Sequence, residues 1–262
     1  MSAILEVRDL TRNFGGLAAL SDVDMDLETG ELVGLIGPNG AGKTTVFNLL
    51  TGVYPPSSGT ITFTPDDAPI KIGGSRPFDI CRAGIARTFQ NIRLFKDLSV
   101  LENVVTAMQQ SQRYGLIASF FHTSAWYRAE QDVRERSLDL LRIMGLEDKS
   151  GELARNLSYG EQRHLEIARA LATDPRLLLL DEPAAGMNPA ETAQLTELIA
   201  WIRQNFKLTI LLIEHDMSLV MAICERIYVL DHGVVIASGT PHEVRHNPRV
   251  IEAYLGEEVT DV

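Results

Sequence analysis

The sequence is poor in several residue types that mark particular classes of protein. Only two of its 262 residues are cysteine, Cys81 and Cys224, and neither lies in a Cys-x-x-Cys or Cys/His metal-binding spacing. This scarcity excludes a disulfide framework and a zinc site, and it is typical of buried free thiols in a reducing compartment. No apolar run approaches the roughly 18 residues that a membrane-spanning helix needs. We therefore expect any role at a membrane to depend on a partner.

The sequence also contains no run of lysine or arginine, and its charge balance is acidic. It has 35 acidic and 24 basic residues, which gives a net charge of -11. Surfaces that bind nucleic acids or anionic lipids are basic, so we expect no nucleic acid and no anionic lipid as the main partner. The hydrophobic content of 45% is enough for one substantial core. Residues 1–262 are therefore expected to form a single domain, with room for an inserted lobe.

Short apolar segments predict an α/β fold with a mainly parallel core sheet. The strand candidates are Glu31–Ile36, Leu177–Leu180, Thr209–Ile213 and Ile227–Leu230. Helical stretches such as Glu191–Arg203 separate them. Continuous apolar strands that alternate with helices are typical of parallel sheets covered on both faces.

Near the start of the chain, the apolar pattern changes to strict alternation. Val23, Met25 and Leu27 alternate with aspartates. The segment Ile61–Phe63, which follows Gly59, is similar. A period of two predicts strands with one solvated face, so we expect an antiparallel β layer here.

A long helix-rich stretch separates the strand regions. Val100–Gly145 has no strand-like run and places Leu138 and Leu141 at helical spacing. This pattern predicts a helical lobe, at about residues 97–173, inserted between regions that carry motifs. Within it, Arg113–Trp126 shows no clear period, and its conformation is not predicted.

A glycine-rich turn follows the strand Glu31–Ile36 and precedes a predicted helix at about Gly42–Thr51. Its residues are Gly37, Pro38, Asn39, Gly40, Ala41, Gly42, Lys43 and Thr44, in the pattern GxxxxGK[ST]. The glycines let the loop wrap so that backbone N–H groups and the helix N-terminus face phosphate oxygens. Lys43 supplies a positive charge, the hydroxyl of Thr44 is placed to bind Mg²⁺, and Thr45 is placed to reach a phosphate oxygen. We therefore predict a phosphate loop.

Two adjacent carboxylates follow the apolar run Leu177–Leu180. Asp181 and Glu182 are expected at the carboxyl edge of the parallel sheet, where ligands of open α/β folds bind. Asp181 is a candidate to hold Mg²⁺ and its waters. Glu182 is a candidate to orient and deprotonate an attacking water near a γ-phosphate.

The segment Leu157–Gln162, with the sequence LSYGEQ, distinguishes between kinds of phosphate-binding protein. Ser158 and Glu161 form a capping box that opens a helix toward Ala172, and an exposed helix N-terminus preceded by Gly160 suits a phosphate. With the phosphate loop and the acid pair, LSYGEQ resembles the LSGGQ signature of ATP-binding-cassette (ABC) ATPases. In that family the signature contacts the ATP held by a second copy of the domain. The resemblance thus implies that Ser158 and Gly160 complete a partner's ATP site.

The same resemblance implies roles for other residues. Gln90, which ends a strand-like run, matches the glutamine that reaches Mg²⁺ and the attacking water and whose backbone follows the membrane subunit. His215 matches the switch histidine that bonds the γ-phosphate. Phe14 stands where the family keeps an aromatic ring to stack on adenine, and Glu182 resembles the catalytic glutamate.

Longer segments narrow the resemblance within the ABC family. These segments are Arg87–Phe95, Asp181–Pro189, Leu211–Met217 and Asn247–Gly256. They look like the cassettes of bacterial high-affinity branched-chain amino acid importers of the LivG type. Tyr159 and Glu161 depart from the common signature, and Asn188 stands where most ABC families have an aspartate. The LivG type shows similar substitutions, although Asn188 puts in doubt any role that requires a carboxylate there.

The resemblance implies a P-loop cassette that binds and hydrolyses ATP with Mg²⁺ to power a membrane transporter, here one that imports branched-chain amino acids. The implied partners are transmembrane permease subunits, a second identical or homologous cassette and, indirectly, a periplasmic or extracellular substrate-binding protein. The implied location is peripheral, on the cytoplasmic face of the inner membrane. Large apolar residues shortly after Gln90, including Leu94 and Phe95, are candidates for a groove that receives a permease helix.

Three alternatives differ in what they leave unexplained. A P-loop kinase or a GTPase would share Lys43 and Asp181 but would not explain LSYGEQ, and the sequence has no Asn/Thr-Lys-x-Asp guanine motif. A chromosome-handling ABC ATPase would need long coiled-coil arms and a basic surface. A cassette for urea, amides or lipopolysaccharide export stays open, because the cassette does not touch the cargo.

Overall fold

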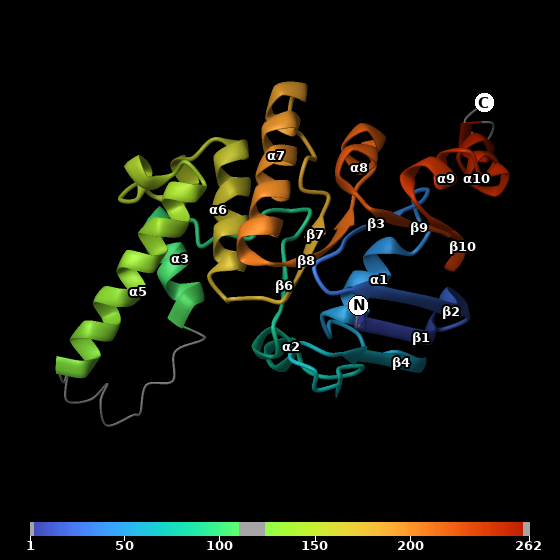
Figure 1. Ribbon diagram of the computed structural model, residues 1–262, viewed down its shortest axis with the longest axis horizontal. Coiled ribbons are helices and arrows are strands. Elements are labelled where there is room, and N and C mark those ends of the chain that lie inside the picture. Colours follow the sequence, from blue (N-terminus) through green and yellow to red (C-terminus); the bar gives the residue numbers. More distant parts are fainter. Residues whose placement is uncertain (1–2, 110–123, 259–262) are drawn as a thin grey trace. The chain divides into compact units, whose positions relative to one another are not determined.

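The computed structural model describes residues 3–109 and 124–258, with the side chains of 3–109 and 127–254. The chain divides into two compact units. The first consists of Met1–Arg87 and Arg176–Val262, and the second of Thr88–Pro175. In Figure 1 the helices of the second unit are coloured green to yellow.

The first unit contains two β-sheets and the helices that cover them. Its strands are β1 (Ala3–Phe14), β2 (Leu17–Glu28), β3 (Leu32–Ile36), β4 (Ser58–Phe63), β5 (Ile70–Lys71), β6 (Ile85–Arg87), β7 (Leu177–Asp181), β8 (Thr209–Ile213), β9 (Arg226–Asp231) and β10 (Val234–Gly239). Its helices are α1 (Lys43–Leu50), α2 (Pro77–Ala83), α7 (Pro189–Phe206), α8 (Met217–Ile223), α9 (Pro241–Arg245) and α10 (Pro248–Glu258).

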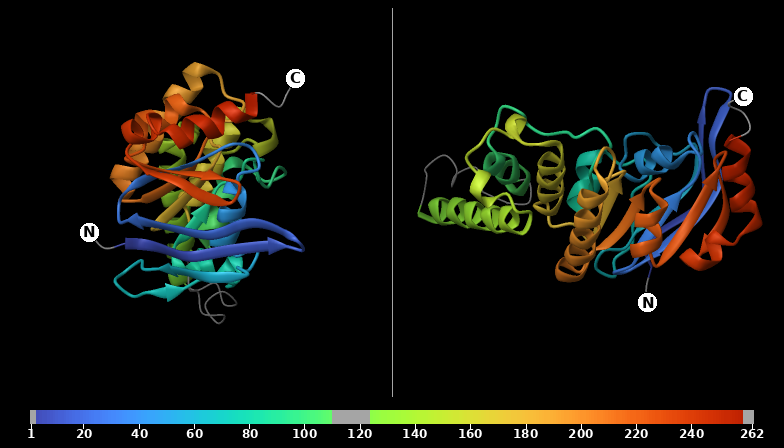
Figure 2. Two further views of the ribbon diagram at one scale, coloured as in Figure 1. Left: turned by 90° about the vertical axis from the view of Figure 1, so that its right-hand side faces the viewer. Right: turned by 90° about the horizontal axis from the view of Figure 1, so that it is seen from above.

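The larger sheet is mainly parallel and has the strand order β10-β9-β3-β8-β7-β6. All neighbouring pairs are parallel except the edge pair, in which β10 runs antiparallel to β9. Every residue of β3, β7 and β8 is buried. Helices α7 and α8 lie on one face of this sheet and α1 lies on the other (Figure 2). The predicted parallel core sheet is confirmed, and its continuous apolar strands reflect burial on both faces.

The smaller sheet is antiparallel, with the order β2-β1-β4-β5. Val23, Met25 and Leu27 of β2 are buried while Asp24 between them is exposed, so the predicted alternation and the antiparallel layer are confirmed. One hydrophobic core joins this sheet, α1 and the larger sheet. Phe47 of α1 is fully buried in it, and burial of such a side chain stabilises the fold by about 1.5–3 kcal/mol.

The second unit is helical. Its elements are α3 (Val100–Gln109), α5 (Ser124–Ile143), the short 3₁₀ helices η1 (Glu147–Lys149) and η2 (Ala154–Asn156), and α6 (Tyr159–Leu171). Helix α3 packs against α5 and α6, and Val104 and Leu141 are fully buried among them. The unit begins at Thr88, before the predicted lobe of residues 97–173, and ends at Pro175. Most of Arg113–Trp126 lies outside the described residues.

Three strands were not predicted, β1, β5 and β10, and a fourth, β4, begins earlier than expected. In β1, register shifts and the left-handed backbone of Asp9 (φ 50°) interrupt the alternation that would have indicated a strand. Strand β10 contains the short apolar run Val234–Ala237, but it is a half-exposed strand at the edge of the sheet. Gly59 lies inside β4 rather than before it, and a Cβ at this position would lie 2.3 Å from the carbonyl oxygen of Asp9. Glycine is therefore required by a close backbone approach, not by a turn.

The structure tests the expectation of buried free thiols and shows the length and hydropathy of the helices. Both cysteines are free. Cys224 is buried as predicted, and burial raises the pKa of its thiol to about 12. Cys81 is only half-buried, so the prediction is wrong for this residue. None of the helices within residues 3–109 and 124–258 has the length and hydropathy to cross a bilayer.

Candidate functional site

Three loops of the first unit meet at one edge of the larger sheet. Leu35 of β3 and Asp181 of β7 both pair with Ile213 of β8, so they form one row across three parallel strands. Neighbouring strands lie about 4.8 Å apart, which places β3 and β7 about 10 Å apart. The loops after these strands carry the predicted phosphate loop, the acid pair and His215. This edge is the carboxyl end of the strands, where open α/β sheets bind ligands.

The phosphate loop cannot accept side chains at two of its glycines. Gly37 has φ 149°, and a Cβ there would lie 1.9 Å from the carbonyl oxygen of Leu230. Gly42 has φ 105°, and its Cβ would lie 2.9 Å from the carbonyl oxygen of Ala19. The loop is therefore shaped by contact with neighbouring backbone, and glycine is the residue type that fits.

Helix α1 begins at Lys43 without a side chain that caps its first turn. Helices α6, α7, α8 and α9 are capped by side chains, whereas α2, like α1, is not. An N-terminus without a cap presents N–H groups and the positive end of the helix dipole, which favours an anion. Lys43 is almost buried, and its Nζ donates to the carbonyl oxygen of Gly37 and, at 2.8 Å, to that of Pro38. The hydroxyl-bearing residue Thr44 is exposed on the first turn.

Asp181 is held by a buried ion pair that sequence reasoning did not identify. Its Oδ2 accepts from Nη2 of Arg87 at 2.7 Å, and both side chains are 6% exposed. Nη1 of Arg87 donates to Oδ1 of Asn48 at 2.8 Å and to Oγ1 of Thr51 at 3.2 Å. Arg87 thus joins the end of α1 to the end of β7. The position of Arg87 at the end of the short strand β6, at the same edge of the sheet as Asp181, is the feature that could have indicated this ion pair.

Glu182 and His215 lie close together on adjacent loops. Oε2 of Glu182 is 3.7 Å from Nδ1 of His215. The imidazole side chain is 68% exposed and the carboxylate 19% exposed, so both can reach a ligand at the surface. Glu182 has a left-handed backbone, with φ 46°. A non-glycine residue in this region is strained by about 1–3 kcal/mol, and such strain clusters at functional sites.

Gln90, Ser158 and Gly160 belong to the second unit. The expectation that Gln90 ends a strand is wrong, because β6 ends at Arg87. From Phe89 onward, the backbone bonds to side chains of α6 instead of a neighbouring strand. The buried guanidinium of Arg163 donates to the carbonyl oxygens of Phe89 at 2.7 Å and Gln90 at 2.9 Å.

Glu166 completes this hold on the loop after β6. Its Oε1 accepts from the N–H groups of Phe89 at 3.2 Å and Arg93 at 3.3 Å, while Oε2 accepts from Arg163 at 2.7 Å. Burial raises the pKa of Glu166, and the cationic partner and the N–H groups oppose this effect. Sequence reasoning missed both residues, because charged side chains on a helix are usually solvated.

The signature residues open α6 as the capping box predicts. Ser158 is the N-cap, and its Oγ accepts from the N–H of Glu161 while Glu161 accepts from the N–H of Ser158. Lys149 also bonds the Glu161 carboxylate, and this bond and those from Ser158 lower its pKa. Gly160 lies inside the first turn of α6 rather than before it, which corrects the sequence prediction. Ser158 is exposed, and its hydroxyl is bonded to Glu161.

The part of the chain that carries these motifs matches a known family. Residues 20–185 match a family model described as ABC transporter. The matched range covers more than half of the chain and includes the phosphate loop, the signature and the acid pair. The chain belongs to the ABC transporter family. It is an ATP-binding cassette, and members of this family are ATPases.

Individual relatives agree with this assignment. The high-affinity branched-chain amino acid transport ATP-binding protein LivG of Salmonella typhimurium is 50% identical over 254 residues, which cover 97% of this chain and 98% of that protein. The lipopolysaccharide export system ATP-binding protein LptB of Escherichia coli is 34% identical over 256 residues. The crystal structure of an ABC transporter cassette in its ADP conformation has a TM-score of 0.83 and 29% identity, covering 98% of this chain and 100% of that one. Residues 234–260 match a model described as branched-chain amino acid ATP-binding cassette transporter.

Two other motif residues of the cassette have local roles. Asn188 is the N-cap of α7 and forms a capping box with Glu191. Phe14 lies at the end of β1, 40% exposed. The guanidinium of Arg12 lies 4.6 Å from its ring centroid, and the ring of Tyr54 makes an edge contact with it at 5.3 Å. Stacking of Phe14 on adenine stays a prediction.

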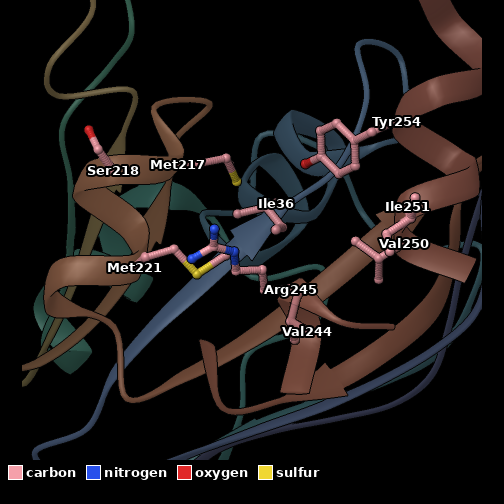
Figure 3. A pocket seen from close by; sticks show the side chains of 9 residues that line it. All are labelled: Ile36, Met217, Ser218, Met221, Val244, Arg245, Val250, Ile251 and Tyr254. Atoms are coloured by element: carbon pink, nitrogen blue, oxygen red, sulfur yellow. The ribbon is translucent and has the colours of Figure 1, made fainter. Parts of the chain in front are cut away.

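The first unit of the cassette also has an apolar pocket of 550 Å³ between α8, α9 and α10 (Figure 3). Its lining residues are Ile36, Met217, Ser218, Met221, Val244, Arg245, Val250, Ile251 and Tyr254. None of them belongs to the phosphate loop, and the lining is mainly apolar. The pocket borders the site through Ile36, which precedes Gly37, but it lacks the chemistry of a triphosphate site.

The buried ion pair generates a stability prediction. Arg87→Met should lower the free energy of unfolding by about 3–5 kcal/mol, because it removes the ion-pair partner of a buried carboxylate. Urea denaturation measures this change. Arg176→Met is the matched control, since the Arg176 side chain is 50% exposed and its ion pair with Asp66 is on the surface. Its effect should stay below about 1 kcal/mol. Equal small losses for both variants would contradict the role of Arg87.

Proposed function

We propose that this cassette is the ATP-hydrolysing subunit of a transporter that imports branched-chain amino acids. The observation that carries the proposal is the 50% identity to LivG over almost the full length of both proteins. The match of residues 234–260 to a branched-chain amino acid cassette model supports it from a separate part of the chain. Lipopolysaccharide export is disfavoured, because identity to LptB is 34% over a similar length.

In the proposed reaction, the phosphate loop binds the β- and γ-phosphates of ATP. The N–H groups at the start of α1 and Nζ of Lys43 supply positive charge there. Thr44 and Asp181 offer a hydroxyl and a carboxylate, which are the oxygen ligands that Mg²⁺ prefers. Gln90 is the further proposed ligand. Mg²⁺, when bound, neutralises charge on the phosphate oxygens.

The described residues contain no cluster of three or more His, Cys, Asp or Glu side chains that could hold a metal ion. This is compatible with Mg²⁺ at a nucleotide site, because there the ion takes few protein ligands and is bound mostly by phosphates and water. Arg87 fixes the orientation of the Asp181 carboxylate for this purpose. The donor set therefore fits a metal that arrives with the nucleotide.

Glu182 and His215 are the proposed catalytic pair. The Glu182 carboxylate orients and deprotonates the attacking water, and the His215 imidazole donates a hydrogen bond to the γ-phosphate. Their separation of 3.7 Å supports a role for both at one reacting group. Both are partly exposed, so an incoming phosphate can reach them.

We further propose that two cassettes pair head to tail, so that Ser158 and Gly160 of one complete the ATP site of the other. Each N-terminal turn of α6 would then face a γ-phosphate held by the partner's phosphate loop. In this proposal residues 1–262 act as one cassette domain, with the helical unit as its inserted lobe. Transmembrane permease subunits complete the transporter at the cytoplasmic face of the membrane, and a substrate-binding protein delivers the amino acid to them from outside.

The permease contact is proposed to lie on the loop after Gln90. Phe95 is 48% exposed and Leu94 is half-buried. The guanidinium of Arg169 lies 4.7 Å from the Phe95 ring centroid, and buried Asn103 bonds both the N–H and the carbonyl oxygen of Phe95 at 3.0 Å. The backbone that presents this large apolar side chain at the surface is thus hydrogen-bonded to a buried side chain. Such a surface suits an apolar anchor on a short partner helix.

Glu182→Gln should lower ATP turnover by a factor on the order of 10² or more, because it removes the general base. Nucleotide affinity should be unchanged, since the phosphate loop is intact. Steady-state ATPase assays and equilibrium binding of a fluorescent nucleotide measure the two quantities. Exposed Glu197 on α7 provides the control variant Glu197→Gln, which should behave as wild type.

The same variants test the cargo in cells. Deletion of the chain should abolish uptake of radiolabelled leucine, isoleucine and valine, and the wild-type chain should restore it. Glu182→Gln should not restore uptake. If leucine uptake persists in the deletion strain while another transport process is lost, the proposed cargo is wrong although the ATPase role stands.

Ser158→Arg should abolish the ATP-dependent association that Glu182→Gln shows on gel filtration, because a bulky cation replaces the cap at the N-terminus of α6. Thermal melting of the monomer serves as the folding control. Hydrolysis of ATP by Ser158→Arg at the wild-type rate, at every protein concentration, would show that the site is not shared between two cassettes.

Phe95→Asp should spare ATP binding and the fold of the isolated chain while it abolishes copurification of the permease subunits and amino acid uptake. The reason is that a charge would occupy the proposed apolar contact. Mass spectrometry of proteins that copurify with the tagged chain measures assembly. Exposed Tyr127 of α5 gives the control Tyr127→Asp, which should assemble normally. Normal assembly and uptake with Phe95→Asp would place the contact elsewhere.

A further inference from the structure

One buried acidic side chain in the first unit has no part in the reaction described above. Glu214 follows the last residue of β8 and directly precedes His215. It is 1% exposed. A buried carboxyl is costly unless it is hydrogen-bonded, and burial raises the pKa of Glu214 above its usual range. Burial of the Glu214 carboxyl therefore lowers the stability of the fold, and its hydrogen bonds offset part of this cost.

The two carboxylate oxygens of Glu214 bond to different loops. Oε1 accepts from the N–H of Ala184 at 2.7 Å, in the loop after Glu182. Oε2 accepts from the N–H of His215 at 3.1 Å and faces that of Asp216 at 3.5 Å. One oxygen thus serves the loop of the proposed base, and the other serves the loop of the proposed switch histidine.

The backbone explains why a side chain is needed at this point. The N–H of Glu182 donates to the carbonyl oxygen of Ile213 at 2.9 Å, which continues the pairing of β7 with β8. The next residue, Pro183, has no N–H, and the left-handed backbone of Glu182 turns the chain away from the sheet. Ala184 then bonds to the Glu214 side chain instead of the backbone of the adjacent strand.

We propose that Glu214 is a positioning residue that fixes the Glu182 loop against the His215 loop, so that the two proposed catalytic side chains meet at one γ-phosphate. The proposal rests on the function assigned above to Glu182 and His215. Catalytic groups must be held close to the productive geometry, and displacement by about 1 Å can cost on the order of 10²-fold in rate.

The isosteric variant Glu214→Gln should keep the hydrogen bonds to one loop and lose those to the other. An amide has a single acceptor oxygen, so it can serve one loop while its NH₂ group opposes an N–H of the other. ATP turnover should fall by about tenfold or more. Affinity for a fluorescent ATP analogue should stay within about twofold, because Lys43 and the α1 N-terminus lie on different elements. The control is Glu197→Gln, an exposed Glu→Gln change that should alter neither quantity.

A double-mutant cycle distinguishes positioning from a general loss of stability. If Glu214 acts through His215, then Glu214→Gln should lower turnover by less than about threefold in a His215→Ala background, although it costs tenfold in the wild type. A merely structural effect would multiply with that of His215→Ala. Thermal melting verifies folding. Should Glu214→Gln fail to fold, Glu214→Asp replaces it in the same cycle, since its shorter side chain keeps both oxygens but loses reach.

The outcomes separate this proposal from the one it rests on. Normal turnover by Glu214→Gln, or full multiplication of the two effects, overturns the positioning role while the site assignment stands. Normal turnover by His215→Ala overturns both the role of His215 and the proposal for Glu214. Reduced turnover with unchanged nucleotide affinity, together with a non-additive cycle, supports the proposal.

Discussion

The pairing of β3, β8 and β7 in register is the constraint on which the site of this cassette depends. Backbone hydrogen bonds align Leu35, Ile213 and Asp181 in one row, and complete burial of the three strands prevents them from sliding. The loops that follow these strands therefore begin side by side at the same edge of the sheet. The phosphate loop, the acid pair and His215 therefore start from one row of the sheet, which the apolar core holds in register.

Polar contacts then refine what the sheet has placed. Arg87 orients Asp181, and Glu214 joins the loops of Glu182 and His215. Both are charged side chains buried beside the site, where an ion pair or a set of N–H donors offsets the cost of desolvation. In the second unit, Arg163 and Glu166 do the same for the backbone around Gln90. Buried charge in this chain consistently accompanies loops that carry proposed functional residues.

The sequence predicted the elements whose signal is local. The phosphate loop and α1 follow from glycine spacing and Lys43, and the capping box of α6 follows from Ser158 and Glu161. The buried strands follow from short aliphatic runs that are separated by helical stretches. The resemblance to ABC ATPases supplied the candidate roles of Gln90, His215 and Phe14, which local pattern alone would not have given.

Other features could not be predicted because their cause is distant in sequence. Strand β1 is recognisable only through its pairing with β2 and β4, since Asp9 breaks its alternation. Strand β6 ends at Arg87, and the backbone groups of Phe89 and Gln90 bond to side chains of α6, more than 70 residues along the chain. Nothing in the local sequence distinguishes these residues from the end of a longer strand.

The hydrogen bonds that bind the loop after β6 affect which of its residues can be substituted during evolution. Arg163, Glu166 and Asn103 bind its main-chain groups, not its side chains. The path of the loop therefore depends on residues of α3 and α6 that bind its backbone, and of its exposed side chains Phe95 also lies against Arg169 of α6. At the proposed permease contact, exposed residues of the loop can therefore change without loss of the hydrogen bonds that hold the backbone. The residues that fix the backbone path of the loop and the exposed residues of the proposed permease contact thus lie in different segments of the sequence. Substitutions in one segment can therefore accumulate while the other stays unchanged.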